Sequence, residues 1–223
     1  MTYASNFDNT YDANLIGLWD FLGGKESKDT GLDDGIAQDG VKIGGSFWGG
    51  YYQTDGKDDH FDVRGNDDPF DLNSGTLVTQ FKMTDDPGRC DDYSTVVSRG
   101  EASDAHKEGF FEVRVTKEGR LEVLHKDNGV GSLLSSGKGF VGEHDLIKVT
   151  YSWDAATGTS VLVENLSDHT TFTATSDVKG LTFDITDNDD ESFTIGAQES
   201  SDGCYDHHLE GKIDYVAVLD KPV

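Results

Sequence analysis

Residues 109–116 read GFFEVRVT, and after a turn at 117–119 residues 120–126 read RLEVLHK. In both runs apolar and polar side chains alternate. Successive side chains of a strand point to opposite faces, so this alternation predicts an antiparallel hairpin with one buried face. Glu112 and Arg114 are expected to face outward. The side chains expected to face inward are Phe111, Val113, Val115, Leu121 and Val123.

Similar short runs occur along most of the chain. No segment carries a sustained helical stripe, and the best periods are all close to two. The pair Asp55-Gly56 inside residues 49–61 is a turn signal that predicts another hairpin. Many short strands separated by turns predict an all-β sandwich or barrel. Further strands are expected at residues 14–22, 75–83, 94–99, 145–153, 160–165, 170–176, 181–185, 192–197 and 211–219.

The domain organisation follows from length and composition. The chain has 223 residues, which suits one large β domain whose core is large enough to be stable without disulfides or metal ions. We expect residues 1–13, a polar stretch, to be a flexible segment, and residues 14–223 to form a single domain.

The charge is strongly acidic, with 43 Asp and Glu against 18 Lys and Arg and a net charge of −25. Such a surface repels nucleic acid and anionic lipid, so neither is expected as a partner. It favours calcium, although adaptation to a marine or halophilic setting explains the charge equally well. No run has the length of a membrane helix, and no cleavable signal peptide is visible. We expect a protein secreted by, or on the surface of, a bacterium, and a marine source fits the charge.

Two cysteines, Cys90 and Cys204, each lie in a polar loop rich in Asp and Gly. They are not in a metal-binding pair such as CxxC. A disulfide between them is our hypothesis, and it implies an oxidising compartment. Two separate thiols are the alternative.

Three segments together resemble a known family. Leu18–Phe21 (LWDF), Tyr51–Phe61 (YYQTDGKDDHF), and Phe193–Ala197 (FTIGA) followed by Leu209–Leu219 (LEGKIDYVAVL) occur in the order found in laminin-G-like domains of the concanavalin A-like lectin/glucanase superfamily. The resemblance implies a two-sheet antiparallel jelly-roll sandwich with a glycan-binding face. The superfamily includes lectins, adhesion domains, carbohydrate-binding modules, glycoside hydrolases and polysaccharide lyases, so fold alone does not give function.

A structural calcium ion is also implied by the resemblance. Calcium takes six to eight oxygen ligands, which Asp-rich loops provide. The alternative is that these aspartates only hydrogen-bond their own turns. The candidate ligands at corresponding places are Asp20, Asp55, Asp58, Asp59 and Asp214.

A ligand surface is predicted around the scarce basic residues Arg99, Arg114 and His125. An arginine there could hold a sugar carboxylate with two parallel hydrogen bonds. The alternative is that the arginines form ordinary surface salt bridges with Glu101 and Glu112, which contribute little. Further predicted ligand residues are Gln198, Tyr205, His207, His208 and Trp48.

Three functions fit these features. The leading one is a carbohydrate-binding module for an acidic polysaccharide, on its own or within a larger multidomain protein. A lyase that cleaves a uronic-acid polysaccharide such as alginate by β-elimination is the alternative, with His125 or Tyr205 as base and Arg99 and Arg114 neutralising the carboxylate. A purely structural domain of a larger exported protein is the third. The acidic motif of the superfamily's glycoside hydrolases is not found.

Overall fold

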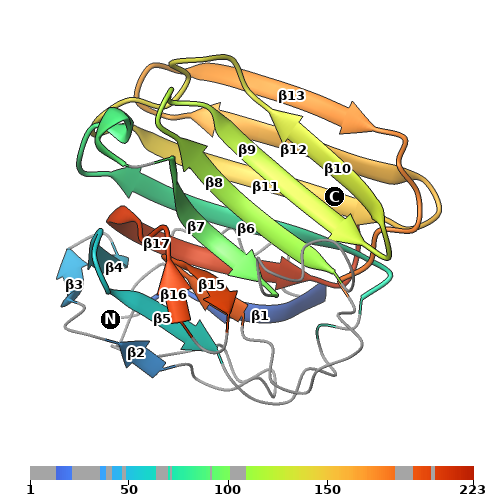
Figure 1. Cartoon of the computed structure of the whole chain (residues 1–223), viewed down its shortest axis with the longest axis horizontal. Helices are drawn as coiled ribbons and strands as arrows, with labels where there is room; N and C mark the ends of the chain where they lie inside the picture. The colour runs from blue at the N-terminus through green and yellow to red at the C-terminus, as the bar shows by residue number, and fades with distance from the viewer. Residues whose placement is uncertain are drawn as a thin grey trace.

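The structure is a computed structural model that describes residues 14–21, 36–38, 42–46, 49–63, 70, 72–90, 92–100, 109–183, 193–201 and 204–223. These residues form two large sheets and a small hairpin, and every strand pairing is antiparallel. Figure 1 shows the arrangement. The predicted two-sheet antiparallel sandwich is therefore confirmed. The prediction for residues 1–13 lies outside the described residues, and the extent of a single domain over 14–223 stays a prediction.

The first sheet has eight strands. Its neighbouring strands are, in order, β13 (Thr170–Ser176), β12 (Gly158–Asn165), β11 (Leu146–Asp154), β6 (Ser74–Met83), β17 (Glu210–Leu219), β4 (Gly49–Asp55) and β3 (Lys42–Ser46), and β1 (Leu15–Trp19) also pairs with β17. The last strand, β17, thus joins strands from the first part of the chain to β6 and the hairpins beyond it.

The second sheet has seven strands. Their order is β10 (Val130–Ser135), β9 (Leu121–Asp127), β8 (Phe110–Thr116), β7 (Tyr93–Arg99), β14 (Phe193–Ile195), β5 (His60–Val63) and β2 (Ile36–Gln38). A hairpin of β15 (Gln198–Ser201) and β16 (Cys204–Asp206) follows β14, and a 3-10 turn at Pro87–Arg89 precedes β7. The edge strands β10 and β13 of the two sheets contact each other (Figure 1).

The main core lies between the two sheets. Trp19 and Trp153 are fully buried there, and Trp153 stacks on Phe183 with ring centroids 4.5 Å apart. As predicted, Phe111 of β8 faces inward, and its ring contacts that of Tyr151 of β11, which also faces inward. A second, smaller apolar cluster on β1, β6 and β17 comprises Leu18, Val78, Tyr215, Ala217 and Leu219.

Two expectations about local structure are wrong. The turn at Asp55-Gly56 does not close a hairpin, because β4 pairs with β17 and β3 whereas β5 pairs with β14 and β2. The turn instead passes the chain from one sheet to the other. Leu181 and Phe183, expected in a strand, lie in a loop segment and are buried in the core.

Among the described residues, no helix is long and apolar enough to cross a membrane.

Candidate functional site

Arg114 lies on the outer face of the seven-stranded sheet, where its guanidinium is already engaged. Its Nε and Nη2 atoms lie 2.9 Å from Glu122 Oε2, and its Nη1 donates to Glu112 Oε2 at 3.1 Å. Its Cζ lies 4.5 Å from the centre of the Tyr93 ring. The partner is Glu112, as in the alternative, but Glu112 is buried, so the pair is not the surface bridge expected there. Glu122 is a second partner from the neighbouring strand β9. This geometry leaves Arg114 little capacity to hold a sugar carboxylate.

Glu112 faces outward from β8, as predicted, yet its exposure is 0%. It accepts a 2.6 Å hydrogen bond from Thr95 Oγ1 in addition to the Arg114 contact. Burial raises the pKa of Glu112 to about 7, although Thr95 and Arg114 both act to lower it. The outer face is therefore covered at this point, and Glu112 is a buried carboxyl group in contact with Thr95 and Arg114.

Pairs of stacked rings cover the same end of this sheet. His207 stacks on Tyr93 and Tyr205 stacks on His60, with centroids 3.9 Å apart in each pair. The Tyr93 hydroxyl donates to Gln198 Oε1 at 2.7 Å, and Gln198 is 2% exposed. Burial raises the pKa of Tyr93 to about 12 and lowers that of His207. These predicted ligand residues are brought together with Arg114, but mainly in contact with one another.

His208 joins two segments rather than facing a groove. Its Nδ1 lies 3.3 Å from the Asp59 carbonyl oxygen and its Nε2 lies 3.2 Å from that of Tyr205. Either ring nitrogen, when it carries the proton, can donate to the backbone carbonyl beside it, which links the β16 loop to the turn before β5.

The predicted shared site of Arg99, Arg114 and His125 is wrong. Arg99 lies opposite Phe111 in the β7–β8 register, so it faces the core, and it is 1% exposed. Its guanidinium lies over the Phe70 ring at 4.9 Å. Arg114 faces the opposite side of the same sheet.

His125 is also in the core, with 1% exposure, between the two sheets. Its Nε2 lies 2.8 Å from the Thr182 carbonyl oxygen, which can only accept, so Nε2 donates and Nδ1 accepts from the Tyr151 hydroxyl at 2.8 Å. Burial lowers the pKa of His125 to about 4. A buried imidazole whose two nitrogens are both hydrogen-bonded cannot reach a polysaccharide. His125 therefore cannot act as the base in the lyase hypothesis. His125 is separated from Leu121 and Val123 by even numbers of positions, so it points to the same face of β9 as they do. This spacing is visible in the sequence.

Three of the predicted calcium ligands do lie together. One carboxylate oxygen from each of Asp55, Asp58 and Asp59 falls within 4.8 Å of the others. Asp59 is 5% exposed and accepts a hydrogen bond from the Asp55 backbone N–H at 3.0 Å. Burial, and then the neighbouring Asp55, raise the pKa of Asp59.

The other two predicted ligands do not join that group. Asp214 lies on β17 and accepts from Gln80 Nε2 at 2.7 Å, and Asp20 follows β1. The five aspartates are therefore not one site. Trp48 lies outside the described residues.

The predicted disulfide is not formed. Cys90 Sγ contacts the Pro87 carbonyl oxygen at 2.8 Å, and Cys204 is exposed at the start of β16. Both residues are thiols in this structure, as the alternative had it.

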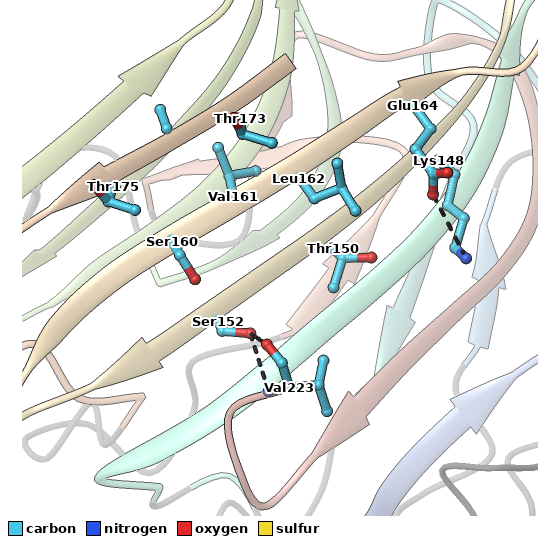
Figure 2. A pocket seen from close by; sticks show the side chains of 11 residues that line it. Lys148, Thr150, Ser152, Ser160, Val161, Leu162, Glu164, Thr173, Thr175 and Val223 are labelled. Atoms are coloured by element: carbon cyan, nitrogen blue, oxygen red, sulfur yellow. Dashed lines mark hydrogen bonds and ion pairs between the residues drawn. The ribbon is translucent and has the colours of Figure 1, made fainter. Parts of the chain in front are cut away.

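A hollow of about 400 Å³ lies on the outer face of the eight-stranded sheet, and sequence reasoning missed it (Figure 2). Strands β11, β12 and β13 supply its floor in registered rows. Thr150, Leu162 and Thr173 lie directly opposite one another, and Ser152, Ser160 and Thr175 form the next row. Lys148 and Glu164 bound one end, with Nζ and Oε2 3.8 Å apart, and Val223 bounds the other.

The lining of this hollow combines side-chain hydroxyl groups with apolar surface and carries little charge. Leu162 is 38% exposed and gives it an apolar centre among hydroxyl groups. Hydroxyls around an exposed apolar side chain match a sugar ring, which has a polar rim and an apolar C–H face.

Solved structures with a similar fold include domains from three kinds of protein. The NanB sialidase from Streptococcus pneumoniae matches 78% of this chain with a TM-score of 0.59 and 19% identity. The Ruminococcus gnavus IT-sialidase CBM40 bound to α2,3 sialyllactose matches 69% with a TM-score of 0.54 and 15% identity, over 78% of that chain. The binding domain of botulinum neurotoxin serotype D matches 96% with a TM-score of 0.64 and 11% identity, over 49% of that chain. This chain has a lectin-like jelly-roll fold.

The likeness has two limits. The chain corresponds to only 26% of the NanB chain, so it compares with one part of that sialidase. No protein-family model matches the sequence, and no curated protein matches it significantly. The structural likeness therefore establishes the jelly-roll sandwich, and residue roles have to come from this chain's own geometry.

Proposed function

We propose that this protein is a non-catalytic carbohydrate-binding module that uses the hollow on β11, β12 and β13 as its sugar site. The observation that carries the proposal is the lining of that hollow, with hydroxyl rows around the exposed Leu162. The jelly-roll fold supports it, because a CBM40 domain of the same fold is bound to a sugar. Membership of the laminin-G-like group and export from a bacterial cell are parts of the same proposal.

An acidic polysaccharide is the ligand class we favour. Sialyllactose, the ligand of the CBM40 structure, carries a carboxylate on its sialic acid. In this chain Lys148 lies at the end of the hollow and is only loosely paired, at 3.8 Å from Glu164. The ammonium group of a lysine at that place can donate hydrogen bonds to the carboxylate of a sugar bound over Leu162.

The test compares two exposed leucines on different sheets. Leu162→Ala should weaken binding of sialyllactose or of a polysaccharide from a mixed panel by about five- to tenfold, because the apolar platform is removed. Leu133→Ala is the matched control, since Leu133 is 53% exposed on β10 of the other sheet. Titration calorimetry and affinity electrophoresis give the affinities. Equal loss in both variants, or no binding of any glycan by the wild type, would refute the proposed module and favour a purely structural domain.

A structural calcium ion at Asp55, Asp58 and Asp59 is the second part of the proposal. The three carboxylates are close enough to share one ion, and the charge of Asp59 acts on a buried hydroxyl, that of Tyr52. Tyr52 is fully buried, its hydroxyl has no hydrogen-bond partner among the described residues, and Asp59 contributes to raising its pKa. Calcium would supply charge neutralisation there.

Calcium binding to the native state should raise the melting temperature relative to protein in EDTA. Asp59→Asn should remove that difference. An unchanged melting temperature in calcium and in EDTA contradicts this part alone and leaves the sugar site untouched.

A further inference from the structure

Two lysines face each other on the eight-stranded sheet. Lys82 of β6 and Lys212 of β17 are direct cross-strand partners on its outer face. Like charges directly opposite each other on a sheet are destabilising. Within the described residues, neither lysine forms an ion pair. Such a placement is unexpected in a chain with 43 acidic and 18 basic residues, where carboxylates are plentiful.

The surroundings engage Lys212 and leave both lysines without full neutralisation. Lys212 Nζ lies over the Tyr51 ring, 4.2 Å from its centre. Asp214 of β17 is close enough for Lys212 and Lys82 both to lower its pKa, but burial outweighs them and the pKa is raised. Its Oδ2 accepts from Gln80, so its oxygen is committed to an amide.

The lysines continue the sugar hollow across the same sheet face. Gln80 lies opposite Lys148, which lines the hollow, and Lys82 lies two residues along β6 from Gln80. On the other side Lys212 lies opposite Gln53 of β4. From β13 to β4 the face crosses six neighbouring strands, which is roughly 24 Å at about 4.8 Å per strand.

We infer that Lys82 and Lys212 bind carboxylate groups of an acidic polysaccharide that lies across the outer face of the eight-stranded sheet, from the hollow to Tyr51. This inference rests on the proposed carbohydrate-binding function and assigns its acid specificity to two residues. A bound carboxylate between the ammonium groups relieves their repulsion. The amide of Gln53, opposite Lys212, lies beside them to hydrogen-bond sugar hydroxyls, whereas the Gln80 amide is held by Asp214.

Charge spacing favours a polysaccharide over other polyanions. Lys82 and Lys212 form one adjacent pair, Lys148 is paired with Glu164, and Asp214 lies near the lysine pair, so positive charge on this face is local rather than continuous. A nucleic acid needs many neighbouring cations to displace its counterions. A uronic-acid chain carries one carboxylate per sugar, with neutral hydroxyls between the carboxylates. That pattern matches the few, separated cationic positions on this sheet face.

The experiment uses polygalacturonate and its carboxyl-reduced, neutral counterpart as probes. The double variant Lys82→Ala/Lys212→Ala should bind polygalacturonate about tenfold more weakly than wild type, since two lysine–carboxylate contacts are worth about 0.5 to 1 kcal/mol each. Binding of the neutral polymer should be unchanged. Lys126→Ala is the matched control, because Lys126 is a strand lysine on β9 of the other sheet. It should match wild type on both polymers.

A stability measurement accompanies the affinities. The single variant Lys82→Ala should unfold at the same temperature as wild type or higher, because it removes a like-charge pair. A lower melting temperature for this variant would show a structural role for the lysine and overturn the inference.

The remaining outcomes separate the inference from the proposed function. If wild type binds both polymers equally and the double variant does too, the module stands and the inference fails. If neither polymer binds but polyglutamate, DNA or phosphatidylserine vesicles bind in a lysine-dependent way, the polysaccharide assignment is overturned. If nothing binds, the proposed function and the inference fall together.

Discussion

The outer faces of the two sheets differ in how their cations are used. On the seven-stranded sheet, Arg114 contacts Glu112, Glu122 and the Tyr93 ring, so its binding capacity is consumed inside the protein. On the eight-stranded sheet, Lys82 and Lys212 face each other without an ion pair in the described part of the chain. Scarcity of basic residues in the sequence pointed to Arg114 and not to the two lysines. What distinguishes a ligand surface is therefore the number of donors left unused after folding.

The largest effect should come from removing Arg114. Arg114→Ala leaves the buried Glu112 without its partner, and breaking a buried pair in this way costs about 3 to 5 kcal/mol of the free energy of unfolding. Urea denaturation measures this loss. Glycan affinity of the folded fraction should be unchanged. Arg120→Ala serves as the control, since Arg120 Nη1 only donates to the Ser136 carbonyl oxygen. A variant of normal stability that loses affinity would reverse the comparison of the two faces.

The pH dependence of the free energy of unfolding tests whether water is excluded from Glu112. The folded pKa of Glu112, about 7, is above its ordinary 4.5, so its contribution to stability is present below pH 4.5 and is lost as pH rises towards 7. The folded pKa of His125, about 4, is below its ordinary 6.5, so its contribution is present above pH 6.5 and is lost as pH falls towards 4. Between pH 4.5 and 6.5 the two slopes oppose each other.

Glu112→Gln should therefore make stability rise more steeply with pH over that window, by about 2 to 3 kcal/mol in total. Denaturation curves at half-unit pH steps, for wild type and variant, give the difference. Identical slopes in the two proteins would mean that Glu112 is open to water.

The smallest stability effect is expected at the hollow. Lys148 and Glu164 are each about one third exposed and 3.8 Å apart, so Lys148→Ala should change the free energy of unfolding by less than about 0.5 kcal/mol. Its polygalacturonate affinity should nevertheless fall. A stability loss comparable to that of Arg114→Ala would place Lys148 among the structural cations.

Local alternation was enough to predict the strands around Phe111 and Tyr151, because one buried face imposes a period of two. The turn at Asp55-Gly56 misled, because the same two residues suit a hairpin and a passage between sheets. Which of these forms depends on β17 and β14, far along the chain. Local sequence carries no information on that choice.

The candidate site was predictable to a smaller extent. Arg114 with Glu112 followed from their spacing on one strand, whereas the Glu122 contact needed the β8–β9 register. The opposition of Lys82 and Lys212 depends on a register between strands that are distant in sequence. The hollow likewise arises from three strands whose serines and threonines are unremarkable one by one.

The position of β17 has a consequence for synthesis of the protein. Its Tyr215 carbonyl oxygen accepts from Thr79 of β6, 136 residues earlier, and the same strand pairs with β1 and β4. Hairpins such as β11–β12 can close soon after they leave the ribosome, because their partners are adjacent in sequence. The early strand β1 must wait for β17, and β4 has only β3 beside it until β17 is made, so their apolar faces stay exposed during most of translation. Chaperone dependence and losses to aggregation during expression should therefore be governed by the arrival of the segment Glu210–Leu219.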